Sequence, residues 1–371
     1  MKRLFLILIF VLLGVTAVYR GAWAESLLFV SDLHLTEEAA AFAPALNAVR
    51  QALQAHDALV LLGDNTNNGK MAEHLSLIRW LTAVRKQMGK AVYVIPGNHD
   101  LSPSVPAGEF GRLYAAFGLN RAFSRDTASL SCAVMTGEGT CLLLLLDTNA
   151  CDDAGRVLPN GGVRAETAAW LDETLSSLPQ STPVIACGHH PLLPETRIQA
   201  TRSADALAQV LKRHRVSVYL CGHDHGFATV DDPALRQITV GQPHAYPGWC
   251  GLLQRLESVL SWRTLPLYDF SGSTWQKLRQ GAETLAYNMA RGTLRGTVHE
   301  GDEDAVRWFA KAFLLYAGGE MTPGDCSALL RDENAQKWRK IETRTVVKSW
   351  IFHLLEHCPP DVRSISLPFP E

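Results

Sequence analysis

The sequence predicts an α/β protein, and two observations carry that prediction. Between residues 27 and 221, short runs rich in Val, Ile and Leu alternate with longer segments of helical periodicity. Such runs are typical of parallel strands buried on both faces, because neither face then needs polar residues. After residue 226 strand-like pieces follow one another directly, and helical periodicity dominates from about residue 270. The pattern therefore predicts a layered α/β domain followed by a helical region.

The elements of the α/β domain can be assigned in chain order. The apolar runs predict strands, and the periodic segments between them predict helices on the faces of the sheet. We expect strands at 27–31, 58–62, 91–95, 142–146, 183–187 and 216–221, helices at 37–55, 71–88, 164–178 and 203–214, and later strands at 235–240, 251–256 and 259–265.

Residues 270–371 have the periodicity of helices. One apolar stripe recurs at intervals of three and four residues, and similar patterns follow at 306–313 and 338–357. Stripes of this kind usually pack into a core, and we interpret this one so, with a ligand-binding face as the alternative. The first stripe consists of Trp275, Leu278, Ala282, Leu285 and Met289.

The first 24 residues have the three parts of a secretory signal. A basic start, Met1-Lys2-Arg3, precedes an apolar run at 4–18, and Ala22-Trp23-Ala24 matches a signal-peptidase site. An uncleaved anchor is the alternative, but the run is shorter than the roughly 20 residues that span a bilayer. We therefore expect cleavage near Ala24, a secreted or periplasmic protein without stable membrane insertion, and domains at 25–269 and 270–371.

Composition narrows the class of protein without naming it. The chain of 371 residues is 47% hydrophobic, which is enough apolar material for a sizeable core and argues against disorder. Its formal net charge of −2 gives no positive field that would attract a nucleic-acid polymer. The sequence leaves the oligomeric state undetermined.

The eight cysteines all follow the predicted signal, and an exported protein can form disulfides. Connectivity cannot be deduced from spacing alone. Two pairs are candidates: Cys132 with Cys141, which flank a glycine-rich turn, and Cys326 with Cys358. Cys187 and Cys221 end apolar strands and are better interpreted as buried free thiols.

Polar residues follow five of the predicted strands, and this arrangement is the main indication of function. The carboxyl ends of parallel strands meet at one edge, where ligands bind in α/β proteins. Carboxylate, amide and imidazole donors gathered there predict a metal centre, and a donor set without thiolate suits Zn, Fe, Mn or Co. The five blocks are Asp32-Leu33-His34, Gly63-Asp64-Asn65, Gly97-Asn98-His99-Asp100, Gly188-His189-His190 and Gly222-His223-Asp224-His225.

In this order, the blocks strongly resemble the signature of the calcineurin-like metallophosphoesterase superfamily, over about residues 27–226. The resemblance implies a four-layer α/β/β/α sandwich that holds two metal ions, with Mn, Fe or Zn as candidates. It places Asp32, His34, Asp64 and His225 on one metal, and Asp64, Asn98, His189 and His223 on the other. It also implies that His99 is the catalytic histidine and does not bind metal.

Two further residues are candidate substrate contacts. His190 is expected either to contact the substrate phosphate or to support a ligand. Asn67 stands where some relatives carry Asp or Tyr, which argues against a tyrosinate-bound iron. Either Asn67 or Asp100 is expected to orient His99.

The resemblance implies that two cations activate water to hydroxide and stabilise the phosphoryl charge during in-line attack. The block Gly63-Asp64-Asn65-Thr66-Asn67-Asn68-Gly69 and the helical C-terminal region are similar to those of exported bacterial members. Together with a similarity to class III cyclic nucleotide phosphodiesterases, this favours a small phosphodiester substrate. The alternatives are a broad phosphomonoesterase that scavenges phosphate and a non-catalytic metal-binding interaction module.

Overall fold

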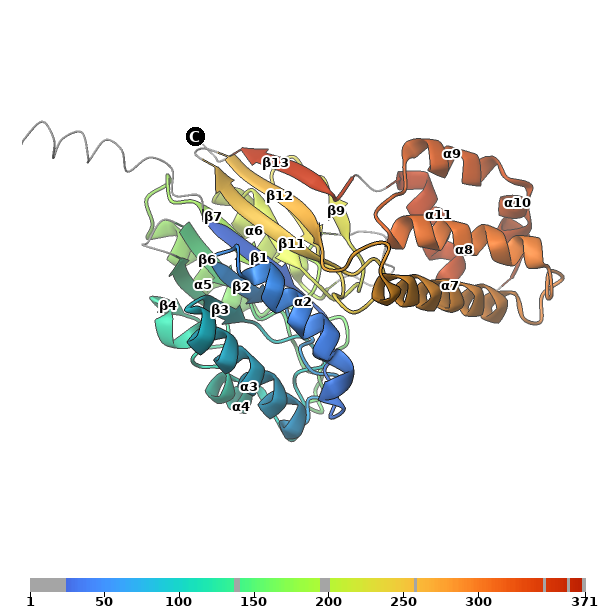
Figure 1. Ribbon diagram of the computed structural model, residues 1–371. Coiled ribbons are helices and arrows are strands. Elements are labelled where there is room, and N and C mark those ends of the chain that lie inside the picture. The colour runs from blue at the N-terminus through green and yellow to red at the C-terminus, as the bar shows by residue number, and fades with distance from the viewer. Residues whose placement is uncertain are drawn as a thin grey trace, which may run out of the picture.

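The computed structural model describes residues 25–136, 141–193, 201–256, 259–342, 345–358 and 361–368. The predicted signal, residues 1–24, lies outside the described residues. Two sheets pack face to face with helices on their outer sides, and a body of helices lies beside them (Figure 1). This arrangement is the expected four-layer α/β/β/α sandwich with C-terminal helices.

The first sheet contains six strands of the described chain. Strands β1, β2 and β3 are parallel, whereas β11, β12 and β13 continue the sheet with antiparallel pairing. The order is β13-β12-β11-β1-β2-β3. The strands are β1 (Ser26–Val30), β2 (Ala58–Leu61), β3 (Ala91–Val94), β11 (Trp249–Leu256), β12 (Val259–Pro266) and β13 (Ser364–Pro368).

The second sheet has seven described strands in the order β4-β5-β6-β7-β8-β10-β9. Its central strands β6, β7, β8 and β10 are parallel, so their carboxyl ends lie along one edge. The strands are β4 (Ser124–Arg125), β5 (Cys132–Thr136), β6 (Cys141–Leu145), β7 (Val184–Cys187), β8 (Val218–Cys221), β9 (Ala228–Val230) and β10 (Arg236–Thr239).

Alternation of side chains along the strands explains why the runs are continuously apolar. Leu27 and Phe29 of β1 face the second sheet in the central core, whereas Leu28 and Val30 face the outer helices. Because both faces of the central strands are covered, every position of β1, β2, β6 and β8 is buried. Helices α2 (Ala43–Leu53), α3 (Met71–Met88) and α4 (Ala107–Leu113) cover the first sheet, and α5 (Ala165–Ser176) and α6 (Ala204–Arg213) cover the second.

The C-terminal helices have a core of their own. At its centre Trp338 stacks on Phe309, with ring centroids 5.1 Å apart, and packs at a tilt against Trp308, with centroids 5.9 Å apart. The helices are α7 (Ser273–Leu294), α8 (Glu303–Ala317), α9 (Pro323–Arg331), α10 (Glu333–Lys340) and α11 (Val347–His357). In the described part of the chain, no helix is both long enough and apolar enough to span a bilayer.

The end of the chain differs from the expectation. Residues 270–371 were expected to be helical, but β13 at 364–368 leaves the helices and pairs with β12. The indole of Trp262 on β12 donates to the carbonyl of Val362, 3.0 Å away, just before this strand. Figure 1 shows β13 at the outer edge of the first sheet. Along the chain, the helices are therefore an insertion between β12 and β13, which are neighbouring strands of one sheet.

The cysteine predictions have different outcomes. The Cys132–Cys141 bridge is wrong, because Cys132 pairs with Leu145 and Cys141 with Thr136, at opposite ends of the β5–β6 ladder. Cys187 and Cys221 are buried free thiols, as predicted. The Cys326 thiol is hydrogen-bonded to that of Cys358, and burial and this neighbour raise its pKa to about 12. Both are free thiols in the structure.

Candidate metal centre

The five polar blocks meet where the two sheets present the carboxyl ends of their parallel strands. Main-chain hydrogen bonds connect the first two blocks: the Asp32 amide donates to Gly63 and the His34 amide to Asp64, at 3.0 and 2.9 Å. Across the sheets, the His223 amide donates to the Asp32 carboxylate at 3.1 Å. The backbone itself therefore fixes the spacing between these side chains.

The first predicted ligand set comes together as expected. Donor atoms of Asp32, His34, Asp64 and His225 all lie within 4.8 Å of one another. The two Nε2 atoms of His34 and His225 face each other at 3.0 Å. Asp32 Oδ1 lies 3.5 Å from His225 Nε2, and Asp64 Oδ2 lies 3.7 Å from His34 Nε2. Two imidazoles and two carboxylates around one point match the nitrogen and oxygen donors that transition metals take.

A second cluster contains His189, His190 and His223, whose donor atoms also lie within 4.8 Å of one another. Asp64 reaches it as well, since its Oδ2 is 3.3 Å from His189 Nε2. Asn98, the fourth expected donor, is placed against the cluster by a 3.2 Å contact between its Oδ1 and His190 Nε2. Asp64 thus lies between the two clusters, in the position expected of a bridging ligand.

The donor atoms fit a bound cation. His189 is fully buried, and its Nδ1 donates to the Leu62 carbonyl at 2.8 Å, which directs Nε2 towards Asp64. His189 Nε2 has no hydrogen-bond partner among the described residues. Burial alone would lower the pKa of His189, but the Asp64 carboxylate outweighs it and raises the pKa to about 9. A positive charge beside Nε2, whether a proton or a metal ion, is therefore strongly favoured.

The two buried carboxylates have opposite pKa shifts. Burial raises the pKa of Asp32 to about 7, and the nearby Asp64 charge adds to the rise. Burial would also raise the pKa of Asp64, but the charge of His189 beside it and the hydrogen bond from the His99 amide hold that pKa well below its usual range. Two carboxylates at this depth need cations to offset their charge.

Backbone strain is concentrated at the expected ligands. Eight residues other than glycine have positive φ in the described chain, and five of them are expected metal ligands. Each such residue costs about 1–3 kcal/mol, a strain that persists only where the surroundings fix it. The five have φ values between 42° and 73° and are Asp32, His34, Asp64, His223 and His225.

Two glycines of the motif blocks allow the strand ends to approach one another. Gly63 has a φ of 92°, and a Cβ there would lie 2.6 Å from His189 Nδ1. A Cβ on Gly97 would lie 2.2 Å from Asp64 Oδ1. Both distances are shorter than any real contact, so these positions exclude other residues because of the ligands beside them.

His99 lies beside the first cluster and outside both groups of donors. Its ring packs edge-on against His34, with centroids 4.7 Å apart, and the side chain is exposed. Its Nδ1 donates to the main-chain carbonyl of Asn67 at 2.7 Å. That bond leaves Nε2 as the ring atom available to a substrate.

The structure decides between Asn67 and Asp100 as the residue that orients His99. Asn67 does so, but through its main chain, so this contact does not depend on the side chain at that position. Asp100 is fully buried and accepts from the amides of Asn65, Thr66 and Gly97. These bonds connect the loop after β2 to the loop after β3 and thereby hold the second and third motif blocks together.

His190 has a supporting position. It is fully buried, its Nδ1 contacts Thr148 Oγ1 at 2.8 Å, and its Nε2 faces Asn98. A ring held at both nitrogens fixes the orientation of the amide beside it. This geometry favours the supporting role over direct contact with substrate.

Thr148 was missed by the sequence reasoning. It follows strand β6 within Asp147-Thr148-Asn149, a sixth polar block at the same edge of the sheet. Asn149 Nδ2 donates to the Pro96 carbonyl at 3.2 Å, directly before the third motif block. The signal was present, since polar residues follow an apolar strand here too, but the block has no place in the five-block signature and was not singled out.

A comparison with models of known protein families identifies the chain. The model of the calcineurin-like phosphoesterase family matches residues 26–227, which is more than half of the sequence. The chain belongs to the calcineurin-like phosphoesterase family. Membership implies a metal-dependent phosphoester hydrolase that typically binds two metal ions, in keeping with the two donor clusters.

Solved structures similar to this family member are distant in sequence. A purple acid phosphatase from yellow lupin (Lupinus luteus) seeds has 12% identity and a TM-score of 0.49, and the match covers 67% of this chain and 52% of that one. A putative 5'-nucleotidase from Staphylococcus aureus has 13% identity and a TM-score of 0.44. That match covers 70% of this chain and 58% of the nucleotidase chain.

A third similar structure is GAP50, the anchor in the inner membrane complex of Plasmodium, with 12% identity and a TM-score of 0.44. The match covers 66% of this chain and 85% of the GAP50 chain. The match to the lupin protein described above spans only about half of that protein's length. No curated protein matches the sequence.

Proposed function

We propose that this protein is an exported phosphoesterase that hydrolyses a small phosphodiester with the help of two metal ions. The position of Asp64, within 3.3 Å of His189 Nε2 and 3.7 Å of His34 Nε2, carries the proposal. One carboxylate shared by two donor clusters is suited to hold two cations close together. When bound, such a pair lowers the pKa of water to near neutrality and stabilises charge on the phosphoryl group.

The residues of the chain have distinct roles in this proposal. Asp32, His34 and His225 hold one cation with Asp64, while Asn98, His189 and His223 hold the other with Asp64. His99 is the catalytic residue, because its Nδ1 donates to the Asn67 carbonyl, which leaves Nε2 available beside the first donor cluster. It stabilises the phosphoryl charge or protonates the leaving oxygen. Mn, Fe and Zn are the candidate metals for these donors.

The charge around the site favours a diester over a monoester. A phosphomonoester carries more negative charge than a diester, and extra cationic side chains would be needed to offset it. Among the described residues that line the adjoining cavity, Lys277 is the only lysine or arginine. This supports a diester, with cyclic nucleotides among the candidates, and leaves a broad phosphomonoesterase as the second candidate function.

A substrate panel tests the proposal. Purified protein loaded with Mn is assayed on bis-p-nitrophenyl phosphate, p-nitrophenyl phosphate and 2',3'- and 3',5'-cyclic nucleotides. The proposal expects a higher kcat/KM on at least one diester than on the monoester. The reverse order would favour the phosphomonoesterase. No hydrolysis with Mn, Zn or Fe, together with failure to bind metal, would favour a non-catalytic interaction module.

Export is tested separately from activity. The proposal places the mature protein in the periplasm or outside the cell, without stable membrane insertion or a nucleic-acid polymer as partner. The N-terminal sequence of the protein recovered from the expressing cell should begin at Glu25. A protein that retains residues 1–24 would contradict cleavage at this site.

A further inference from the structure

A large cavity lies between the metal centre and the C-terminal helices. Its volume is about 750 Å³, within the range of roughly 300–1,000 Å³ found for ligand pockets. His225, which belongs to the first donor cluster, is one of the residues that line it. A molecule whose phosphate lies at the metal centre can therefore extend directly into this space.

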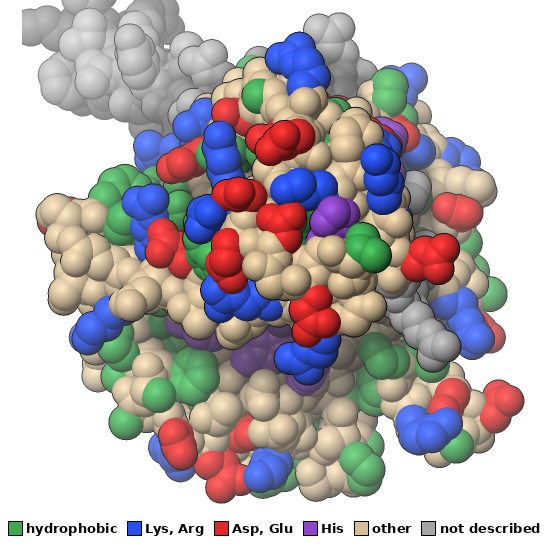
Figure 2. All heavy atoms as spheres, turned by 90° about the vertical axis from the view of Figure 1, so that its right-hand side faces the viewer, with side chains coloured by type: hydrophobic (Ala, Val, Ile, Leu, Met, Phe, Trp, Pro, Cys, Tyr) green, Lys and Arg blue, Asp and Glu red, His purple; other side chains and the backbone are tan. Residues whose placement is uncertain are grey.

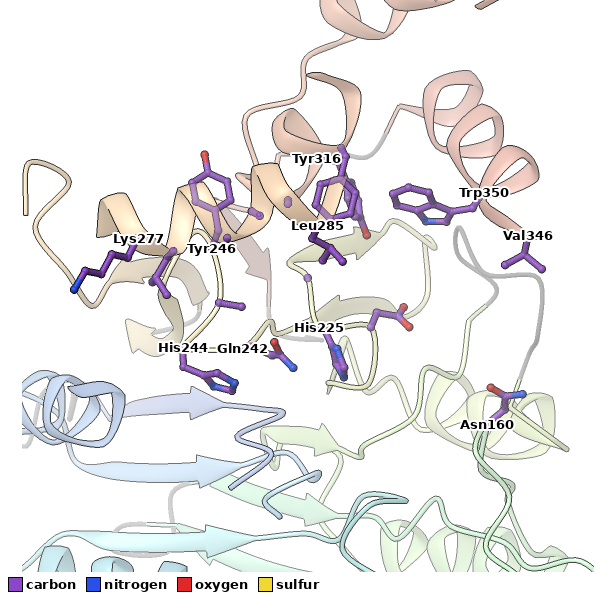
Figure 3. Close-up of a pocket in the computed structure, with 18 residues that line it drawn as sticks. Asn160, His225, Gln242, His244, Tyr246, Lys277, Leu285, Tyr316, Val346 and Trp350 are labelled. Atoms are coloured by element: carbon purple, nitrogen blue, oxygen red, sulfur yellow. The ribbon is translucent and has the colours of Figure 1, made fainter. Parts of the chain in front are cut away.

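The two sides of the cavity differ in chemistry. The sandwich side is polar and contributes Gln242 and His244, whereas α7 contributes Leu278 and Leu285 (Figure 3). Burial lowers the pKa of His244 to about 4, with the nearby His34 adding to the shift. The helices add the rings of Phe313, Tyr316 and Trp350, and the loop between β10 and β11 adds the ring of Tyr246. Figure 2 shows histidine side chains gathered in a hollow beneath the helices.

Large apolar side chains are unusually exposed on this helical side. Leu285 is 52% exposed and Val346 is 60% exposed. They are two of the six large hydrophobic residues that are exposed in the described part of the chain, and both line the cavity. Apolar groups that face a concave surface favour an apolar ligand there.

The middle of the apolar stripe of α7 lines this cavity, whereas Met289 packs against the core of the helices. The expectation that the stripe packs into a core is wrong for Leu278, Ala282 and Leu285, which line the cavity. The fully buried residues of α7 belong mainly to its last third, from Ala286 to Leu294. The position of these three residues therefore agrees with the alternative interpretation, in which the stripe forms a ligand-binding face.

The helical side offers few groups that could recognise a polar ligand. Apart from Lys277, the Tyr316 hydroxyl and the Trp350 indole N–H, its described lining consists of hydrocarbon and aromatic surface. A nucleobase needs partners for its hydrogen-bonding edges, and leaving them unpaired costs affinity. A hydrocarbon chain needs none and gains from every methylene that it buries.

We propose that the cavity between the metal centre and the helices binds the hydrocarbon chain of an amphiphilic phosphoester. The proposal rests on the phosphoesterase function proposed above and narrows its substrate class. The phosphate end lies against His225, and the chain lies along the stripe of α7 towards Trp350.

Binding of non-hydrolysable diester analogues tests the proposal without relying on turnover. Alkyl(methyl)phosphinic acids carry one negative charge, and both of their P–C bonds resist hydrolysis. Calorimetry measures the affinity of the Mn-loaded full chain for the ethyl, hexyl and decyl compounds below their micelle concentrations. We expect affinity to rise by about threefold to fourfold per buried methylene until the cavity is filled, and by at least about 100-fold from ethyl to decyl.

Two matched variants locate the effect. Leu285→Glu places a charge on the cavity wall and should lower the affinity for decyl at least about tenfold, so that the chain-length series flattens. Leu75→Glu changes an exposed leucine of α3, 41% exposed and outside the cavity lining, and should leave the series unchanged.

Several results would overturn the proposal. These are an affinity independent of chain length, equal weakening of ethyl and decyl by Leu285→Glu, binding only above the micelle concentration, or tighter binding of an adenosyl than of a decyl analogue. Chain-length-dependent binding without hydrolysis of any phosphoester would instead contradict the proposed function and leave the cavity assignment intact.

Discussion

Asp64 Oδ2 lies 3.3 Å from His189 Nε2, although the two residues follow strands of different sheets. Asp64 follows β2 of the first sheet and His189 follows β7 of the second. The candidate metal centre therefore joins the two halves of the sandwich. This relationship links the chemistry of the site to the stability of the fold.

Replacement of Asp64 should abolish metal binding and activity together. Asp64→Ala removes the carboxylate shared by both donor clusters, so we expect loss of at least one of two metal ions and of measurable hydrolysis. Metal content by mass spectrometry of the purified protein and kcat on the best panel substrate check this. A variant with two metals and full activity would contradict the bridging role.

Replacement of His99 should separate metal binding from catalysis. His99→Ala leaves the donor clusters intact, so we expect normal metal content and a kcat lower by about 10²–10⁴. The same two measurements apply. Loss of a metal ion from this variant would place His99 among the ligands instead.

Thr148 should act through His190 on the second cluster. Thr148→Val keeps the shape of the side chain but removes the hydroxyl that contacts His190 Nδ1, so we expect metal affinity to fall by about 10- to 100-fold. Titration with Mn or Zn after chelation measures it. Thr148→Ser retains the hydroxyl and should restore affinity; equal affinities of all three proteins would refute the role.

Removal of metal should destabilise the whole sandwich, because the ligands come from both sheets. A metal present at 100 times its Kd stabilises the folded state by about 2.7 kcal/mol. For a domain of this size we expect the Tm to fall by about 5–10 °C when a chelator is added. Calorimetry checks this, and Asp64→Ala, which is expected to lose at least one ion, serves as a control whose Tm should fall less when the chelator is added.

Cys326 and Cys358 should form a disulfide under oxidising conditions, since their thiols are already in contact. The bridge would join α9 to the end of α11 and stabilise the helices by roughly 2–4 kcal/mol. Peptide mapping of the oxidised protein without reductant should detect the linked pair. Cys132 and Cys141 provide the contrast, because their register keeps them apart and both should remain open to alkylation in the unfolded chain.

The sequence predicted the framework of the site because its signals were local. Each parallel strand is an apolar run that is followed by polar residues. This pattern is visible in the sequence alone and was enough to locate Asp32 and Asp64. Features that depend on distant pairing were not accessible. β13 was missed because Ile365 and Leu367 are buried only by pairing with β12, about one hundred residues earlier.

Two other differences have the same origin. Cys132 and Cys141 looked well placed along the chain, but the register of the β5–β6 ladder separates them. The periodicity of α7 indicated an apolar face without indicating what that face meets. Leu285 faces a cavity because the helices lie opposite the strand ends and not on a sheet.

The return of the chain to β13 changes how the helices can move. A region attached by one linker can swing far from its neighbour, whereas this one is attached at both β12 and β13, adjacent strands of a single sheet. Double attachment keeps the effective concentration of the α7 wall over the metal centre high and limits its motion to small hinge movements. Deletion of residues 270–371 would remove an edge strand as well as the helices, so joining residue 270 directly to residue 361 is the more informative deletion.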